Sequence, residues 1–326
     1  MKHGLRPLLV VAVLGLLAAA LGAQVPDNAR YVGSRMCITC HRATDREVTT
    51  KYVEGRMANA LIEVNMDNEE QVDKYLVCDF TDAPFTRDDI AWILATGENE
   101  QAYMDADFQV LPAKWIVAEN RWQEIPAVDG FTECVPCHST DFNTEERTFR
   151  VAGVGCESCH GPGSVHQTAA PANKLTTILQ LNTLDAHTSS MVCGQCHSKG
   201  RSTDGTSPFP IGYKPGANLD DFMVQEEVTG PGQNQQYTDL VGTQHWENEV
   251  GCLTCHDPHG DTGNPAQLHQ PINDTCLSCH ADTVTDIPTH AAEHNVEAAA
   301  DATCATCHMP EGRHLFDSAV AAETAG

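Results

Sequence analysis

The chain is poor in aromatic residues and in basic ones. Phe, Trp and Tyr make up 6% of its 326 residues, which is little aromatic surface for a chain that must build its own core. Lys and Arg number 19 against 45 Asp and Glu, a formal net charge of −26. Such a surface repels nucleic acids and anionic lipids, so we expect no nucleic-acid partner. It favours basic partners or metal cations, or it serves solubility alone.

Long apolar runs are missing after the first residues. The start, MKHGLRP followed by LLVVAVLGLLAAAL, combines basic residues, an apolar stretch of about 14 residues and a region rich in small residues. This pattern predicts a signal peptide over residues 1–23, cleaved near Ala20 or Ala23, with an uncleaved anchor as the alternative. We therefore expect a periplasmic or extracellular protein with no transmembrane segment once the signal is removed.

Cysteine is plentiful and almost all of it recurs in one pattern. Seven copies of Cys-x-x-Cys-His account for fourteen of the fifteen cysteines, leaving only Cys78. The cysteine pairs are Cys37 and Cys40, Cys134 and Cys137, Cys156 and Cys159, Cys193 and Cys196, Cys252 and Cys255, Cys276 and Cys279, and Cys304 and Cys307. The histidines that follow are His41, His138, His160, His197, His256, His280 and His308.

This motif attaches c-type haem, because its two thiols form thioethers and its histidine ligates the iron. Zinc sites and disulfide scaffolds do not need a histidine after every second cysteine. We predict seven covalently bound haem c groups, numbered here by motif from haem 1 to haem 7. A buried structural thiol is the interpretation of Cys78, with an intermolecular disulfide as the alternative.

Seven haems leave roughly 43 residues of mature chain for each, so the cofactors must supply much of the buried surface. The fold class predicted is a multihaem cytochrome c with a haem-packed core, mainly α-helical with long irregular loops and a small β-hairpin lobe. A compact chain of this length has a radius of gyration of roughly 19 Å, so every haem should lie close to another. A continuous electron path is the consequence.

The motifs and the composition between them divide the chain into four parts. Residues 1–23 are the signal peptide, and residues 24–130 form an N-terminal lobe with haem 1 and a small α/β insertion. Within the lobe we predict a helix over 43–64, a helix from a capping box at Thr86 to a stop at Gly97, and a hairpin over 107–125. Residues 131–240 carry haems 2–4 and an extended, proline-rich linker over 201–240. Residues 241–326 carry haems 5–7 and a short tail.

A second axial ligand decides whether a haem iron transfers electrons or stays open for catalysis. Eight further histidines are candidates: His166, His187, His245, His259, His269, His290, His294 and His314. That number is close to what full bis-histidine ligation requires. His259 follows His256 too closely to reach the opposite face of the same haem, so it should bind a neighbouring one. Met57, on the predicted helix 43–64, is the candidate for haem 1, which otherwise takes a distant histidine or stays open.

Several segments resemble the multihaem cytochromes of the cytochrome c-554 superfamily. They are YVGSRMCITCH, GVGCESCHGPGSVH, MVCGQCHSKG, EVGCLTCHDPHG, CATCHMP and the lobe IAWILATGENEQAYMDADFQVLPAKWIVAENRW. The resemblance implies an exported helix-and-loop protein that carries electrons between respiratory partners, and it makes His166, His245 and His259 distal ligands. Met57 stands where many members have the histidine of a W-x-x-S-x-H segment.

We therefore expect an electron carrier of anaerobic or extracellular respiration. Its partners would be quinol-oxidising cytochromes, terminal reductases or extracellular acceptors. A polymeric haem filament is one version, in which His290, His294 or His314 crosses to a neighbouring subunit. The alternative is a multihaem oxidoreductase acting on nitrogen or sulfur oxyanions at a five-coordinate haem. All seven motifs end in histidine, which argues against the enzymes that replace this residue by lysine, and we assign no catalytic residue.

Overall fold

A computed structural model describes residues 25–228, 230 and 234–316. The predicted signal peptide and the end of the tail therefore lie outside the described residues. In the described ranges no helix combines the length and the apolar character that crossing a membrane requires.

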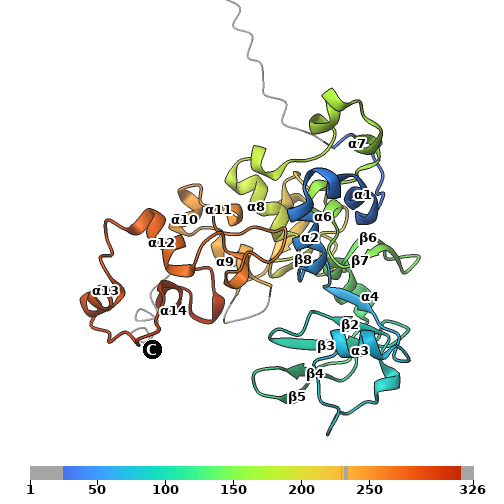
Figure 1. The fold of residues 1–326 in the computed structure, drawn as a ribbon, viewed down its shortest axis with the longest axis horizontal. Helices are drawn as coiled ribbons and strands as arrows, with labels where there is room; N and C mark the ends of the chain where they lie inside the picture. Colours follow the sequence, from blue (N-terminus) through green and yellow to red (C-terminus); the bar gives the residue numbers. More distant parts are fainter. Residues whose placement is uncertain (1–24, 229, 231–233, 317–326) are drawn as a thin grey trace, which may run out of the picture.

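The described helices are short, and the haem motifs lie on them or at their ends. They are α1 (Ser34–Thr44), α2 (Arg46–Glu54), α3 (Glu69–Tyr75), α4 (Gly130–Glu133), α5 (Val135–His138), α6 (Cys156–His160), α7 (Ser164–Thr168), α8 (Ala186–Gly194), α9 (Gln236–Leu240), α10 (Gln244–Glu247), α11 (Cys252–Cys255), α12 (Ile272–His280), α13 (Ile287–Glu293) and α14 (Cys304–His308). Long irregular segments connect them (Figure 1).

The strands form small antiparallel sheets. They are β1 (Leu61–Glu63), β2 (Trp92–Leu94), β3 (Glu100–Met104), β4 (Ala113–Ile116), β5 (Arg121–Glu124), β6 (Ser139–Asn143), β7 (Thr148–Ala152), β8 (Gly200–Ser202) and β9 (Met223–Gln225). Strands β1 to β5 form one five-stranded sheet in sequential order, and β6–β7 and β8–β9 form two separate hairpin-like pairs. Helices with small antiparallel sheets agree with the predicted fold class at this coarse level.

The five-stranded lobe is larger than the predicted hairpin. The expected hairpin is present as β4–β5, with Trp115 opposite Trp122. The helix predicted over 43–64 is wrong in its second half: α2 ends at Glu54, and Leu61–Glu63 form strand β1. The helix predicted to run from Thr86 to Gly97 is also wrong. The Thr86 capping box starts only a turn of 3₁₀ helix, and β2 follows.

These corrections have one physical cause. Leu61 pairs with Leu94 in the sheet, and both side chains are buried there. Strand pairing and burial outweigh local helix propensity in such short apolar segments. The core cluster around them also contains Met104 and Phe131, and it extends to Cys134 of the second motif. The lobe core therefore supports the haem 2 site directly.

The predicted linker over 201–240 is not a plain extended segment. Strands β8 and β9 pair within it, and Tyr213, Leu219 and Met223 pack with Tyr237 into a small core. Proline prevents long helices here, but the aromatic and aliphatic side chains still find a common interior.

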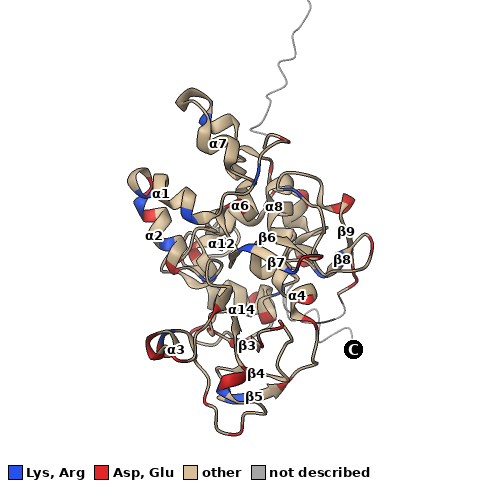
Figure 2. Ribbon diagram, turned by 90° about the vertical axis from the view of Figure 1, so that its right-hand side faces the viewer, with Lys and Arg blue, Asp and Glu red and all other residues tan. Residues whose placement is uncertain are grey.

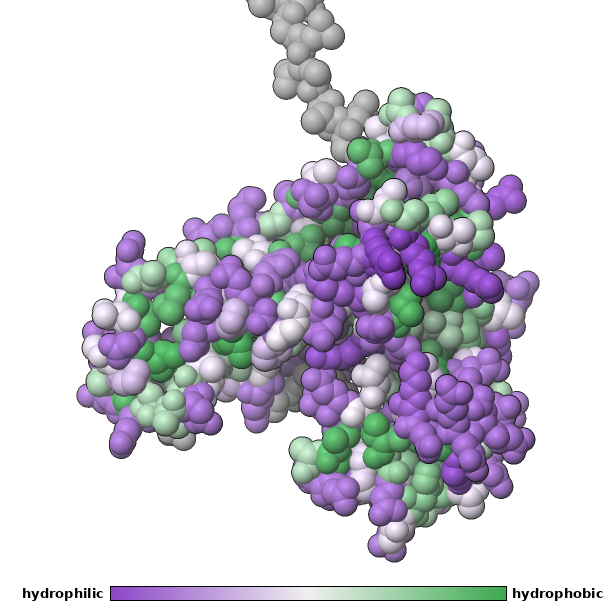
Figure 3. Space-filling view, viewed as in Figure 1, coloured by the Kyte–Doolittle hydropathy of each residue, from purple (hydrophilic) through white to green (hydrophobic). Residues whose placement is uncertain are grey.

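Residues 241–316 have almost no apolar core of their own. They form an arm that extends from the rest of the molecule and carries α10 to α14 (Figure 1). Ala291 is the only buried apolar side chain among these described residues. Apolar residues lie at the surface of the arm instead (Figure 3). A polypeptide with three haem motifs and no interior depends on its cofactors for buried surface.

A buried carboxylate connects the start of the described chain to the third motif. Glu157, within the motif on α6, is 1% exposed and accepts backbone N–H bonds from Val32, Gly33 and Gly163 at 2.7 to 3.1 Å.

We expect Glu157→Ala to lower the free energy of unfolding by about 3 kcal/mol, because three buried N–H groups lose their acceptor. Denaturant unfolding of the haem-loaded protein measures this. The exposed Glu146→Ala is the control and should change stability little, so an equal loss in both would contradict the assignment.

Candidate haem sites

The thiols of the motifs are available for attachment to haem. All fifteen cysteines, every one within the described ranges, are free of disulfide bonds. In this part of the chain no three His, Cys, Asp or Glu side chains converge so that they could hold a metal ion unaided. Haem attachment needs no such convergence, because the two thiols bind the porphyrin rather than the metal.

Most motif histidines are held by their Nδ1 atom, which leaves Nε2 to face a metal. A hydrogen bond to Nδ1 fixes the tautomer and the orientation of a metal-ligating imidazole. The Nδ1 partners are Asp45 Oδ2 for His41 (3.0 Å), Ala60 O for His138 (2.7 Å), Leu179 O for His160 (2.8 Å), Gln236 Oε1 for His197 (3.2 Å) and Ala266 O for His256 (2.7 Å).

Burial favours the neutral form of the interior motif histidines. It lowers the pKa of His138, His160 and His197 below the ordinary value of 6.5. Neutral imidazole is the form that ligates iron, so the protein prepares these rings for coordination.

Five motif histidines have a second imidazole ring opposite them at nearly constant separation. The ring centres are 6.2 Å apart for His41 and His166, 6.3 Å for His160 and His259, 6.2 Å for His256 and His314, 5.9 Å for His280 and His245, and 6.0 Å for His308 and His290. The first two pairs are nearly parallel, with interplanar angles of 14°.

This separation matches two imidazoles that share one metal ion. Imidazole nitrogens bind metals at about 2 Å, so two rings on opposite sides of an ion have nitrogens about 4 Å apart and centres about 6 Å apart. Direct ring stacking would be closer, as the 3.9 Å between His187 and Trp246 illustrates. The residues present therefore fit haem with two axial histidines at motifs 1, 3, 5, 6 and 7.

The opposing histidines His166, His259 and His314 are also held by Nδ1. The partners are Lys174 O at 2.9 Å, Asp257 Oδ1 at 2.9 Å and Gly312 O at 3.0 Å. His259 lies opposite His160 rather than its sequence neighbour His256. His245 lies opposite His280, one motif beyond the nearest one in the sequence.

The ring opposite His41 belongs to His166, 125 positions later. This geometry favours the distant histidine, the alternative to Met57 considered for haem 1. Met57 lines a small pocket with Tyr52, Pro258 and His259. Helix α2 ends before Gly55, and the Met57 carbonyl accepts from Ala60 N–H at 3.2 Å in the turn that leads to β1. Local helical spacing therefore did not apply to this residue.

Two other predicted ligands are held by the opposite ring nitrogen. The Nε2 atom of His187 lies 2.8 Å from Trp246 O, and that of His269 lies 3.2 Å from Leu253 O. Neither ring stands opposite a motif histidine at the separation described above. His187, His245 and His269 all lie six or seven residues before a motif, but only the His245 ring lies opposite a motif histidine. Sequence spacing therefore did not separate His245 from the other two.

The last motif has two histidines near its own. His290 and His294 have ring centres 4.7 Å apart, and their centres lie 6.0 Å and 6.5 Å from that of His308. The His290 ring is the closer to parallel with His308, at 32° against 79°. His290 Nδ1 is buried without a hydrogen-bond partner, whereas His294 is exposed. Their one-turn spacing, read from the sequence, is present, and His290 is the better placed.

Motifs 2 and 4 differ from the others. No histidine ring in the described part of the chain faces His138 or His197 at about 6 Å, as the five pairs above do. These two sites are the candidates for an open axial position, whereas sequence reasoning placed that possibility at haem 1. The number of histidines did not reveal that motifs 2 and 4 lack an opposing ring. His187, His269 and His294 raise the count to eight, but none of them lies opposite His138 or His197.

Contacts between neighbouring motifs order them in space. Cys156 N–H of motif 3 donates to Ser34 Oγ on α1, the helix of motif 1, at 3.1 Å. Gln195 Nε2 of motif 4 donates to Ser158 O of motif 3 at 3.0 Å, and Cys196 Sγ of motif 4 lies 3.9 Å from Cys137 O of motif 2. Cys252 N–H of motif 5 donates to Ser190 Oγ on α8, and Cys304 N–H of motif 7 donates to Asn273 Oδ1 on α12, both at 3.0 Å. Cys279 of motif 6 lies close enough to Cys255 of motif 5 to raise the pKa of its thiol. The motifs thus follow the order 1–3–4–5–6–7, with motif 2 beside motif 4.

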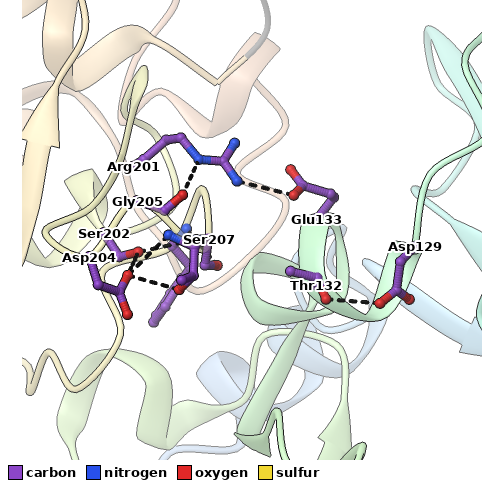
Figure 4. Close-up of polar contacts among 10 residues, drawn as sticks. Asp129, Thr132, Glu133, Arg201, Ser202, Asp204, Gly205 and Ser207 are labelled. Carbon is purple, nitrogen blue, oxygen red and sulfur yellow. Dashed lines mark hydrogen bonds and ion pairs between the residues drawn. The ribbon is translucent and has the colours of Figure 1, made fainter.

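An ion pair helps to hold motifs 2 and 4 together. Arg201 on β8 donates from Nη2 to Glu133 Oε1 at 3.1 Å and from Nε to Gly205 O at 3.0 Å (Figure 4). Glu133 directly precedes Cys134, and Arg201 follows His197 by four residues. The contact joins the segment after one motif to the segment before the other.

A second ion pair positions His314. The side chain of Asp239 is 1% exposed and accepts two hydrogen bonds of 2.8 Å from the Arg313 guanidinium, while His314 N–H donates to Asp239 Oδ2 at 3.1 Å.

We expect Arg313→Ala to lower the free energy of unfolding by about 3 kcal/mol, because a buried carboxylate loses its counter-charge. It should also weaken the hold on His314. Unfolding and the haem spectrum measure the two effects. The exposed Lys214→Ala should leave both unchanged, and an unaltered Arg313→Ala protein would contradict the assignment.

Comparison with known proteins agrees with this architecture. The family model for cytochrome c554 and c-prime matches residues 113–161, and the doubled CXXCH motif matches residues 245–285. The multiheme cytochrome MtrA of Shewanella baltica is 29% identical over 148 residues, 40% of this chain and 44% of the relative. The dissimilatory sulfite reductase MccA of Wolinella succinogenes is 26% identical over 215 residues, 54% of this chain and 27% of the relative. This chain thus matches less than half the length of either curated relative.

The fold also resembles a solved structure over most of its length. The outer cell wall cytochrome OcwA superposes with a TM-score of 0.68 and 21% sequence identity, covering 88% of this chain and 79% of that one. At this identity the likeness concerns the fold. Together with the motifs, the matches support a multihaem c-type cytochrome with covalently bound haem.

Proposed function

We propose that this multihaem cytochrome is an exported heptahaem electron carrier of anaerobic or extracellular respiration. The observation that carries the proposal is the set of five histidine pairs about 6 Å apart, each with one member in a Cys-x-x-Cys-His motif. Bound haem would supply an iron that takes up and releases one electron, without binding substrate where both axial positions are filled.

The residues of the chain would hold the haems as follows. The fourteen motif cysteines form the thioether bonds, and the seven motif histidines are proximal ligands. His166, His259, His314, His245 and His290 are the distal ligands of haems 1, 3, 5, 6 and 7. Contacts between motifs keep each haem site beside the next in the order 1–3–4–5–6–7, with site 2 joined at site 4. A branched conductor with three ends, at sites 1, 2 and 7, is the consequence.

Mass and spectroscopy of the purified protein test this proposal. We expect the mass of the mature polypeptide plus seven haems, and low-spin ferric signals from five of them. Mixing the fully reduced protein with an oxidant should oxidise all haems together, because neighbouring sites exchange electrons faster than the oxidant reacts. A preparation without covalent haem, or one in which most haems stay reduced, would contradict the proposal.

A second candidate function is reduction of nitrogen or sulfur oxyanions at an open haem. His138 and His197 lack an opposing imidazole among the described residues, and one curated relative bears the name of a sulfite reductase. Carbon monoxide added to the reduced protein should bind at two haems if sites 2 and 4 are open. Consumption of nitrite or sulfite with reduced methyl viologen would favour the enzyme, and binding without consumption would favour the carrier.

The polymeric version of the carrier has one structural candidate for a subunit-crossing ligand. His294 is exposed and lies beyond the better-placed His290 at haem 7. His314, the third histidine considered from the sequence, has His256 opposite it within the same chain. Sedimentation velocity over a range of concentrations tests the polymer. A monomer at every concentration would remove this version and leave the carrier itself in place.

A further inference from the structure

Two of the three ends of the haem order, at sites 1 and 7, carry opposite charge, although the protein as a whole is strongly acidic. Residues 29–57, which contain motif 1 with helices α1 and α2, hold six basic and three acidic side chains, a net charge of +3. Residues 244–316, which contain motifs 5, 6 and 7, hold eleven acidic side chains and one basic residue, a net charge of −10. Figure 2 shows basic positions along α1 and α2 at one corner of the molecule, and acidic positions spread over much of the remainder.

Three arginines of this corner have no ionic partner. Arg35, Arg42 and Arg46 are exposed, and among the described residues none of them lies within 4.0 Å of a carboxylate. We call them the arginine patch. The neighbouring Lys51 and Arg56 are different, since they pair with Glu47 and Glu98. Figure 3 shows strongly hydrophilic side chains where α1 and α2 lie in Figure 1.

The geometry of α1 turns the patch away from the haem thiols. Arg35 and Arg42 are seven residues apart and therefore share one face of the helix. At about 100° per residue, Cys37 and Cys40 lie roughly half a turn around the helix from these arginines. The face with the thiols holds the haem, and the opposite face carries the unpaired positive charge to solvent. The arginines are therefore not placed to neutralise the propionates of their own haem.

Apolar side chains are exposed on the same two helices. Met36 is 41% exposed, Val48 40% and Val53 51%. Arginine and methionine are enriched in protein–protein interfaces, where a few apolar contacts are combined with complementary charge. Basic side chains reduce the net charge of so acidic a protein, so solubility does not explain the arginine patch. An interaction surface does.

We propose that the arginine patch, with Met36, Val48 and Val53, is the docking surface for the acidic face of a redox partner that exchanges electrons at haem 1. The inference rests on the proposed function, and it names the partner chemistry of one end of the conductor. The net charge of the protein predicted basic partners, whereas the arginine patch predicts an acidic partner at haem 1. The −10 end at haems 5–7 repels the same acidic partner, so docking is favoured at haem 1 over haems 5–7.

Charge reversal with a matched control tests the proposal. The variant Arg35→Glu with Arg42→Glu and Arg46→Glu removes the patch. The control Lys74→Glu with Arg87→Glu and Lys214→Glu changes the total charge by the same amount at exposed positions elsewhere. The haem-loaded proteins are reduced and mixed with hexacyanoferrate(III), an anionic oxidant that represents the acidic partner, or with hexaammineruthenium(III), a cationic one. Stopped-flow absorbance gives the second-order rate constants at low and high ionic strength.

We expect the patch variant to react about tenfold more slowly with the anionic oxidant than the control does, at low ionic strength. At about 1 M salt, where the Debye length is near 3 Å, the difference should disappear. The cationic oxidant should not be slowed in either variant. Equal rates for the patch variant and the control would overturn the proposal, because only total charge would then matter. A changed haem 1 spectrum with unchanged rates would overturn it too, since the arginines would then serve their own haem.

Two further outcomes separate this inference from the proposed function. If sedimentation shows wild-type chains associating and the patch variant not, the patch binds the acidic end of a second copy, and the proposal of a different partner is overturned. If neither oxidant oxidises any haem, the electron-carrier function itself fails. If all haems are oxidised and the patch variant reacts at the same rate as the control, only the docking proposal fails and the electron-carrier function stands.

Discussion

Protein made without haem is expected to lose the structure of its C-terminal arm while keeping its five-stranded lobe. Residues 241–316 bury one apolar side chain, Ala291, so the cofactors must supply most of the buried apolar surface that holds α10 to α14 in place. The lobe formed by β1 to β5 has two apolar clusters of its own, around Phe131 and around Tyr103. Stability should therefore divide between these two parts of the chain.

Limited proteolysis followed by mass spectrometry measures this. In the apoprotein we expect cleavage within residues 241–316 at least about tenfold faster than in the haem-loaded protein, since local opening governs cleavage. Cleavage between β1 and β5 should change much less. The variant Cys304→Ser with Cys307→Ser, which removes one haem, should lose one haem in mass and show the faster cleavage chiefly near α12 to α14. A protected arm in the apoprotein would contradict this account.

Replacing His166 is expected to change the spin state of haem 1, whereas replacing Met57 is not. His41 and His166 have ring centres 6.2 Å apart and nearly parallel planes, as two axial ligands on one iron would. In His166→Ala the haem loses one of these ligands. The ferric spectrum of one haem should then change from low-spin to high-spin, and carbon monoxide should bind the reduced protein at one additional haem.

Two control variants make this result specific. Met57→Leu keeps the volume of the side chain, and His187→Ala removes a histidine whose Nε2 is bonded to Trp246 O. Both should keep the wild-type number of low-spin haems. If Met57→Leu produced the high-spin signal and His166→Ala did not, the methionine interpretation drawn from the sequence would be correct and the histidine pair would not be a ligand pair.

Much of the chemistry was readable from the sequence because it is local. Two cysteines and a histidine within five residues define a haem attachment site wherever the chain goes. The unusual number of further histidines likewise indicated bis-histidine ligation, and the family and structural comparisons support the multihaem cytochrome. The β4–β5 hairpin was also predictable, since its alternating aromatic strands and short turn are local signals.

Ligand pairing was not readable, because it joins residues far apart in the chain. His166 meets His41, and His314 meets His256, only after the chain has folded back on itself. Local spacing gave the same weight to His187, His245 and His269, although the structure uses their ring nitrogens differently. The helix expected at Met57 ended early because Leu61 gained more from pairing with Leu94 in a buried sheet than from continuing a helix.

The amino-acid sequence by itself determined that this protein is a multihaem c-type cytochrome with covalently bound haem, and that it is acidic overall. Covalent attachment depends on a short contiguous motif, and net charge depends on composition alone. Only the tertiary structure decided which histidine faces which motif, which motifs are neighbours, and that the described carboxylates lie more than 4.0 Å from Arg35, Arg42 and Arg46. Those properties depend on distances between remote segments, which packing establishes and sequence separation does not reveal.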